Sequence, residues 1–140
     1  MCFYRRGHFL RIALRKKKCY KVMDISIVDS KVILTPRIYG RKSFALGGTI
    51  EAATKLSNRK FINALRINRL RMLEGEVVHS YDNKWFKDHR AEFASYYPCC
   101  AVIECEIPKG TFYWHNRWHR EYAATSVKLV KVIWNPLDRA

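Results

Sequence analysis

The sequence predicts an α+β fold in a single domain, with a mixed, mostly antiparallel sheet and two main helices. The chain of 140 residues is 49% hydrophobic and 14% aromatic, which suits one well-formed core. Segments with strand periodicity and segments with helical periodicity follow one another in mixed order. No internal repeat or low-complexity linker divides the chain, so residues 1–140 are expected to form one domain.

The first half is expected to begin with strands. The basic run at 15–18 leads directly into CYKVM (19–23), so it marks the start of a strand rather than a free tail. ISIVDSKVILTP (25–36) predicts a strand, an Asp-Ser turn and a second strand that ends at Pro36. RIYGRKSFALGGT (37–49) is a glycine-containing loop with short extended pieces, without the spacing of a known phosphate-binding motif.

Two segments predict helices. SNRKFINALRINRLRMLEG (57–75) has Ser57 or Asn58 as N-cap and is strongly basic. NKWFKDHRAEFASYY (83–97) follows a possible cap at Asp82 or Asn83 and ends before Pro98. Between the two helices, GEVVHSY (75–81) predicts a short strand.

The last third of the chain is expected to return to strands. CCAVIECEI (99–107) alternates in polarity and places Cys105 on its buried side. Pro-Lys-Gly-Thr (108–111) predicts a turn, and TSVKLVKVIW (125–134) predicts a final strand that is central or well covered. Residues 113–122 between them are expected to form a polar, aromatic loop at a sheet edge.

The positive charge is concentrated in one half of the sequence. The net charge is +15, and residues 1–73 carry 18 Lys and Arg against three acids. Residues 74–140 carry nine of each sign and are neutral. This asymmetry favours a polyanionic partner, although it is also compatible with solubility alone. The candidate anion-binding residues are Arg41, Lys42, Arg59, Lys60, Arg66 and Arg69.

Neither a metal nor a cofactor is predicted. The five cysteines are odd in number and include no C-x-x-C pair, so reduced thiols used as small apolar residues are favoured. Cys100, Cys105, His115 and His119 form the minor alternative of a zinc site. The sequence has no apolar run long enough to cross a bilayer and no secretory signal, so an intracellular protein without membrane association is expected.

Several short phrases resemble a family of small bacteriophage and prophage proteins. They are MCFY, CYKVM, GEVVHSY, ECEIPKGTFYW and EYAATSVKLV. The resemblance covers both ends of the chain, and residues 30–73 match poorly. It implies a viral protein in the cytoplasm of the host cell, and no activity comes with it.

A looser resemblance is to the ADP-ribosyltransferase fold. Residues that match its motifs occur here in the same order, and they are Lys21, Ser80, IPKGT (107–111) and Glu121. Enzymes of that fold usually have Arg or His, Ser-Thr-Ser, and Glu-x-Glu or a lone Glu, whereas this chain has Lys, His-Ser-Tyr and His-x-Glu. The resemblance implies Glu121 as the catalytic carboxylate, with His79 or Lys21 holding a nucleotide.

The favoured hypothesis is a non-enzymatic protein that binds a phosphate-bearing ligand. The ligand is a nucleotide, including a host defence signal, or a nucleic acid. The candidate ligand-binding residues are Lys21, His79, Ser80, Tyr81, Lys109, Thr111, Tyr113, Trp114, Trp118 and Tyr122.

Three alternatives stay open. The first is a divergent ADP-ribosyltransferase-like enzyme that uses Glu121 and His79. The second is an inhibitor that binds an acidic host protein through the basic helix at 57–73. The third is a nucleophilic thiol at Cys2, whose pKa the neighbouring arginines would lower.

Overall fold

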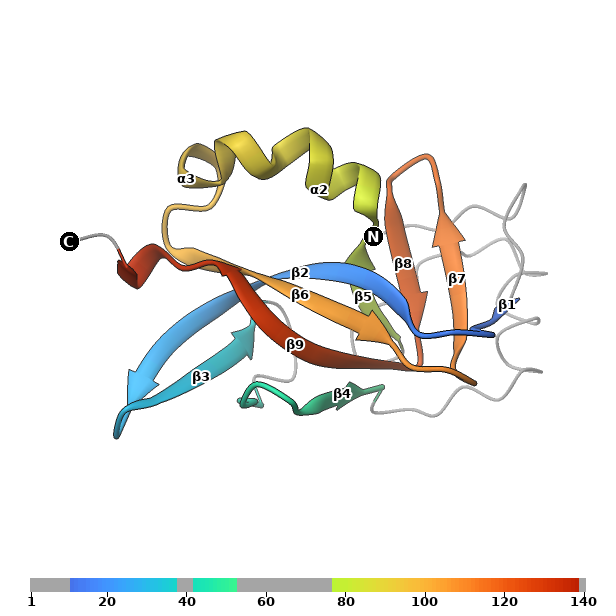
Figure 1. Cartoon of the computed structure of the whole chain (residues 1–140), viewed down its shortest axis with the longest axis horizontal. Coiled ribbons are helices and arrows are strands. Elements are labelled where there is room, and N and C mark those ends of the chain that lie inside the picture. Colours follow the sequence, from blue (N-terminus) through green and yellow to red (C-terminus); the bar gives the residue numbers. More distant parts are fainter. Residues whose placement is uncertain (1–10, 38–41, 53–76, 139–140) are drawn as a thin grey trace.

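The computed structural model describes residues 11–37, 42–52 and 77–138, which form an antiparallel sheet with one helical segment packed on it (Figure 1). The strand order is β1-β7-β8-β5-β2-β6-β9-β4, and β3 pairs with β2 outside this path. The strands are β1 Arg11–Ile12, β2 Lys17–Val28, β3 Lys31–Pro36, β4 Thr49–Glu51, β5 Val78–Tyr81, β6 Cys100–Ile107, β7 Phe112–Asn116, β8 Glu121–Ala124 and β9 Ser126–Trp134. A short 3₁₀ turn, η2, follows at Pro136–Asp138.

The long strand β2 organises the sheet. It pairs with β6 on one side, and with β5 and β3 on the other. The predicted Asp-Ser turn is confirmed, with Asp29 at φ 52° and Ser30 at φ 64°. Two successive residues with positive φ are the geometry that joins antiparallel strands in a tight hairpin, which accounts for the break between β2 and β3.

The predicted helix at 83–97 is confirmed as one joined segment of 14 residues, made of α2 Asn83–His89, η1 Arg90–Glu92 and α3 Phe93–Tyr96. Its N-cap is Asp82, whose Oδ1 accepts a hydrogen bond from the Trp85 amide at 2.9 Å. The other predicted helix, at residues 57–75, lies outside the described residues. The described chain is therefore mostly sheet with one helical segment, in keeping with an α+β fold.

The helical segment packs on one face of the sheet through aromatic side chains. The Tyr20 and Phe86 rings stack at 4.3 Å between centroids, and the Tyr81 and Trp85 rings stack at 4.1 Å. Burial of several aromatic rings in this way stabilises the contact far more than the propensity of a short helix does.

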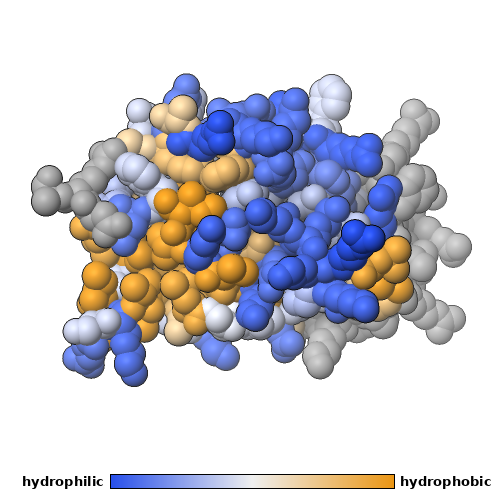
Figure 2. All heavy atoms as spheres, in the orientation of Figure 1, coloured by the Kyte–Doolittle hydropathy of each residue, from blue (hydrophilic) through white to orange (hydrophobic). Residues whose placement is uncertain are grey.

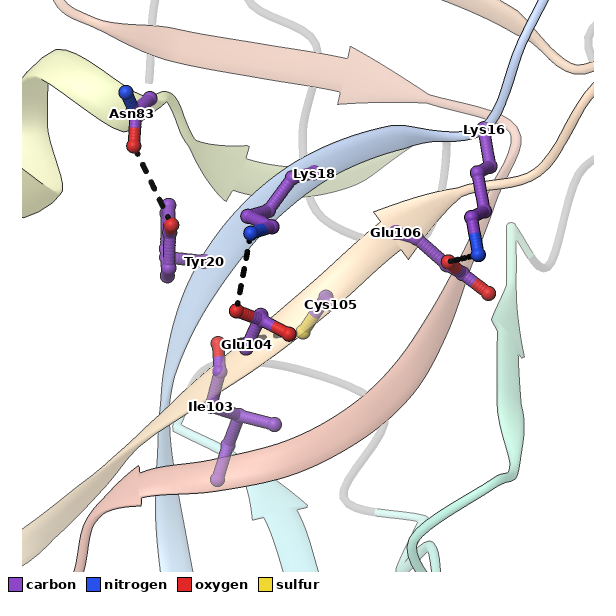
Figure 3. A network of polar contacts seen from close by, with 8 residues as sticks. All are labelled: Lys16, Lys18, Tyr20, Asn83, Ile103, Glu104, Cys105 and Glu106. Carbon is purple, nitrogen blue, oxygen red and sulfur yellow. Dashed lines mark hydrogen bonds and ion pairs between the residues drawn. The ribbon is translucent and has the colours of Figure 1, made fainter.

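Beyond the helix, the same face is polar. Lys16 and Lys18 of the β2 region lie 3.8 Å from Glu106 and 3.6 Å from Glu104 of β6 (Figure 3). Figure 2 shows hydrophilic side chains over the middle of this face and hydrophobic ones over the side where the β2–β3 hairpin lies. Exposed ion pairs of this kind contribute little to stability, so the sheet depends on its other face and on the helix.

The opposite face of the sheet carries the larger core. Cys105 is buried there, as predicted, directly opposite the buried Cys19 of β2. Other buried members of this core are Met23, Leu34, Ile103, Ile107, Val127 and Leu129. The strand at 100–107 is not half-exposed in its first part, because Cys100 and Val102 are also buried, with Val102 packed among the aromatic rings of the helix side.

The prediction of an edge loop at 113–122 is wrong, because this segment forms the hairpin β7–β8 within the sheet. Only Arg117 to Arg120 form its turn. Strand β8 pairs with both β7 and β5, and Asn116 at the end of β7 is fully buried, with its side-chain oxygen accepting a hydrogen bond from the His119 amide at 3.2 Å. Strand β9 lies between β6 and β4, so the predicted central position of the last strand is confirmed, although its Val130 and Lys131 are exposed.

Candidate functional site: a basic pocket beside strand β7

A basic segment at 11–17 is held against the start of β7. Arg11 and Ile12 form β1 and pair with Tyr113 and Phe112 (Figure 1). The buried Ala13 donates from its amide to the Thr111 carbonyl at 2.9 Å and accepts from the Gly110 amide at 2.7 Å. The Pro-Lys-Gly-Thr turn thus serves as the anchor that positions this segment.

The segment encloses an open pocket of about 750 Å³, here named the basic pocket. Its described lining residues are Arg11, Ile12, Ala13, Leu14, Arg15, Lys16, Lys17 and Tyr113. Four of these side chains are cationic, and Tyr113 supplies an aromatic ring. Tyr113 is itself only 7% exposed, so the cations are the main surface of the pocket, and clustered cations suit a ligand that carries phosphate groups.

The positive charge of the basic pocket is only partly compensated. Lys16 lies 3.8 Å from Glu106, and its side chain stays 77% exposed, so the carboxylate is a weak competitor for it. The Lys17 ammonium lies 5.5 Å from the Tyr113 ring centre and 5.6 Å from that of Tyr122. These rings orient Lys17 without neutralising it, because a cation–π contact leaves the charge in place.

A row of polar and aromatic side chains leads away from the basic pocket. The Tyr122 ring, next to Lys17, lies 4.4 Å from the His115 ring. His115 Nε2 is 2.8 Å from Asp82 Oδ2, so this carboxylate holds both the imidazole and the start of α2. Burial lowers the pKa of His115, while the hydrogen bond and charge of Asp82 oppose that shift.

Glu121 lies at the start of β8, opposite Tyr81 of β5 and Asn116 of β7. Burial raises the pKa of its carboxyl to about 7, and the Asp82 carboxylate adds to the rise. Its chain neighbour Arg120 donates to Asp88 of α2. Glu121 is therefore a carboxyl group that titrates near neutral pH.

This titration predicts that stability falls as pH rises from about 5 to about 8. The unfolded carboxyl has the ordinary pKa of 4.5 and the folded one a pKa of about 7. Between these values only the folded state keeps the proton, so the contribution to stability is complete below the lower pKa and lost as pH rises through the upper one. Glu121→Gln is expected to flatten this dependence in urea unfolding, whereas Glu51→Gln on the exposed part of β4 is not. Parallel pH profiles for wild type and Glu121→Gln would contradict the assignment.

The structure buries six of the ten predicted ligand-binding residues, Tyr113 among them. Lys21 donates from Nζ to the His79 carbonyl at 2.5 Å, and both side chains are buried. Ser80, Trp114 and Tyr122 are also buried. Lys109 and Trp118 are exposed, Thr111 and Tyr81 are half-buried, and Tyr113 lines the basic pocket. The buried members shape the sheet behind the site rather than offering surface to a ligand.

The residues of the transferase resemblance do not share one face. Tyr20 pairs with Tyr81 and Tyr81 with Glu121, so these three lie on the helix face. Lys21 is next to Tyr20 in β2, and alternation puts it on the opposite face. His79 lies on the face of Glu121 but is buried.

The cysteines and histidines considered as zinc ligands are also separated. Cys100 and Cys105 lie on opposite faces of β6, where the Cys100 thiol bonds to Asp24 and Cys105 lies opposite Cys19. His115 is held by Asp82, and His119 lies in the exposed turn. In the three described stretches, no three His, Cys, Asp or Glu side chains gather as a metal would need.

The predicted anion-binding residues are mostly outside the described residues. Lys42 is described and exposed, with its ammonium 5.9 Å from the Phe44 ring centre. Arg41, Arg59, Lys60, Arg66 and Arg69 lie outside the described ranges, as does Cys2. Sequence reasoning missed the pocket cations because the run at 15–18 was interpreted only as the start of a strand. The basic run itself was the signal that could have found them.

Comparisons with known proteins found no match: no family model fits the sequence, and no curated protein and no solved structure is significantly similar. Within the described ranges, no helix is long and apolar enough to cross a membrane.

Proposed function

We propose that this protein binds a phosphate-bearing ligand, a nucleotide or a nucleic acid, through the basic pocket. The observation that supports this most strongly is that four cationic residues, Arg11, Arg15, Lys16 and Lys17, line one open cavity together with Tyr113. A nucleic acid carries condensed counterions, and protein cations that neutralise its phosphates release those counterions, which favours binding.

Binding without chemistry fits the site better than catalysis. The pocket cations can neutralise and orient phosphate oxygens, and Arg side chains can do so with two parallel hydrogen bonds. Transfer chemistry would need the Glu121 carboxylate on the same surface as the nucleotide-holding groups. Lys21 is buried on the opposite face of the sheet from Glu121, so the transferase hypothesis is not favoured.

The resemblance to bacteriophage proteins supports a role inside an infected host cell. There, a phosphate-binding protein would meet nucleotide signals and nucleic acids in the cytoplasm. The alternative partner is an acidic host protein, which basic residues would also attract. The binding experiment distinguishes this partner from a nucleotide or a nucleic acid. A protein partner would leave both nucleotide and oligonucleotide probes unbound.

Salt dependence tests the proposal and separates the two ligand types. A fluorescein-labelled dT12 strand and a fluorescent ATP analogue are titrated with the protein while anisotropy is followed. If four cations contact phosphates of a single strand, the affinity should fall about 50-fold between about 50 and about 200 mM salt. A nucleotide held in the pocket should lose much less. Absence of binding by both probes at the lower salt concentration would overturn the proposal.

A further inference from the structure

The turn between β7 and β8 carries an unusual side chain. Trp118 is 86% exposed, whereas Trp85 is 5% and Trp114 is 0% exposed. Tryptophan has the largest apolar surface of any residue, so leaving one in water gives up a substantial stabilisation. Tryptophan is enriched among the residues that contribute most to binding at interfaces.

The turn that presents Trp118 is held by specific contacts on both sides. The fully buried Asn116 accepts a hydrogen bond from the His119 amide at 3.2 Å. The Asp82 amide donates to the Arg120 carbonyl at 2.8 Å, and the Arg120 side chain pairs with Asp88. Arg120 itself has a positive φ of 56°. The indole therefore projects from a pre-organised turn, which lowers the entropic cost of binding to it.

The chemistry around the indole is that of a base-stacking platform. Trp118 is flanked by the exposed Arg117 and by His119, and no acidic residue belongs to the turn. An apolar protein partner would favour a wider hydrophobic surround, whereas a nucleobase needs one flat ring with cations beside it. Stacking of an unpaired base on such a ring is worth about 1 to 3 kcal/mol.

Strand β7 links this turn to the basic pocket. Tyr113 at its start lines the pocket, and Trp118 follows its last residue, Asn116. With a rise of about 3.3 Å per residue, the two rings are separated by roughly 15 to 20 Å. A single nucleotide cannot reach both, whereas a strand of about four to six nucleotides can. His115 and Tyr122 lie between the two ends.

We infer that the basic pocket and Trp118 act together as a binding site for single-stranded nucleic acid, with phosphates at the pocket and an unpaired base stacked on the indole. This inference rests on the proposed phosphate-binding function and names the ligand class. It excludes a paired duplex as the preferred ligand, because paired bases offer no free face to the ring.

The test measures affinity as a function of strand length. Fluorescein-labelled dT2, dT4, dT8 and a GC-rich duplex of about 16 base pairs, which stays paired at this salt concentration, are titrated with wild type, Trp118→Ala and Trp118→Phe at about 50 mM salt. Trp118→Ala is expected to weaken dT8 binding about 10-fold, to leave dT2 unchanged and to leave the duplex unchanged. Trp118→Phe, which keeps an aromatic face, is expected to retain most of the affinity for dT8.

The outcomes separate this inference from the function on which it rests. Equal affinity of Trp118→Ala and wild type for dT8 would overturn the stacking role while the pocket proposal stands. Binding of the ATP analogue without binding of any single strand would do the same. An equal loss for dT2 and dT8 would show that the two ends are not separate, which also contradicts the inference. If neither the strands nor the nucleotide bind, the proposed function itself fails.

Discussion

Replacing Trp114 by Ala is expected to lower the free energy of unfolding by about 3 to 5 kcal/mol. The side chain is 0% exposed and lies on β7 directly opposite Ala123, which is itself fully buried. A methyl group opposite the gap cannot expand to fill it, so the truncation leaves a cavity as well as losing the transfer free energy of the ring. A loss of this size is a large part of the stability of a domain of this length.

Trp118→Ala is the matched control, because it removes the same side chain from the same hairpin. At 86% exposure it is expected to change stability by no more than about 0.5 kcal/mol. Urea unfolding followed by circular dichroism measures both variants. Similar stabilities for the two variants would contradict the placement of one indole in the core and the other in solvent.

The strands and the helix were predictable where the signal is local. The Asp-Ser turn at 29 and 30, the cap at Asp82 and the glycine turn after Pro108 each depend on the conformational preferences of a few residues. The alternation in residues 100–107 placed Cys105 inside because one side of β6 faces the larger core. Such features need no knowledge of distant contacts.

The hairpin β7–β8 was missed for the opposite reason. Its polar residues indicate a loop when only neighbours in sequence are considered. Asn116 is nevertheless fully buried, and its side-chain oxygen accepts a hydrogen bond from the His119 amide in the turn. The buried polar side chain thus forms a hydrogen bond that the local sequence pattern does not show.

The basic pocket also depends on contacts between residues that are far apart in the sequence. Arg15 to Lys18 are visible as a run in the sequence, but their role follows from where Ala13 is tied to the turn after β6. Net charge led to the hypothesis of a phosphate-bearing ligand, and the structure shows which of the described cations line one cavity. Several residues that were predicted to contact the ligand have a structural role, because Lys21, His79 and Trp114 are buried.

The largest effect on binding is expected from reversing two pocket charges. The double variant Arg11→Glu with Arg15→Glu replaces two attractions to phosphate by two repulsions in the wall of the pocket. At about 1 kcal/mol for each attraction lost and each repulsion gained, less the screening by salt, the affinity should fall about 100-fold. Both side chains are exposed, so the fold should be retained.

The most direct measurement is therefore anisotropy of labelled dT12 and of the ATP analogue with this double variant, beside Lys31→Glu with Lys84→Glu. The control makes the same change in net charge, at the tip of the β2–β3 hairpin and on α2 (Figure 1). Binding through the basic pocket predicts an approximately 100-fold loss for the pocket variant and a loss of only a few-fold for the control. Equal losses for the two variants would show that the charge acts without a site, and would contradict the basic pocket as the binding site.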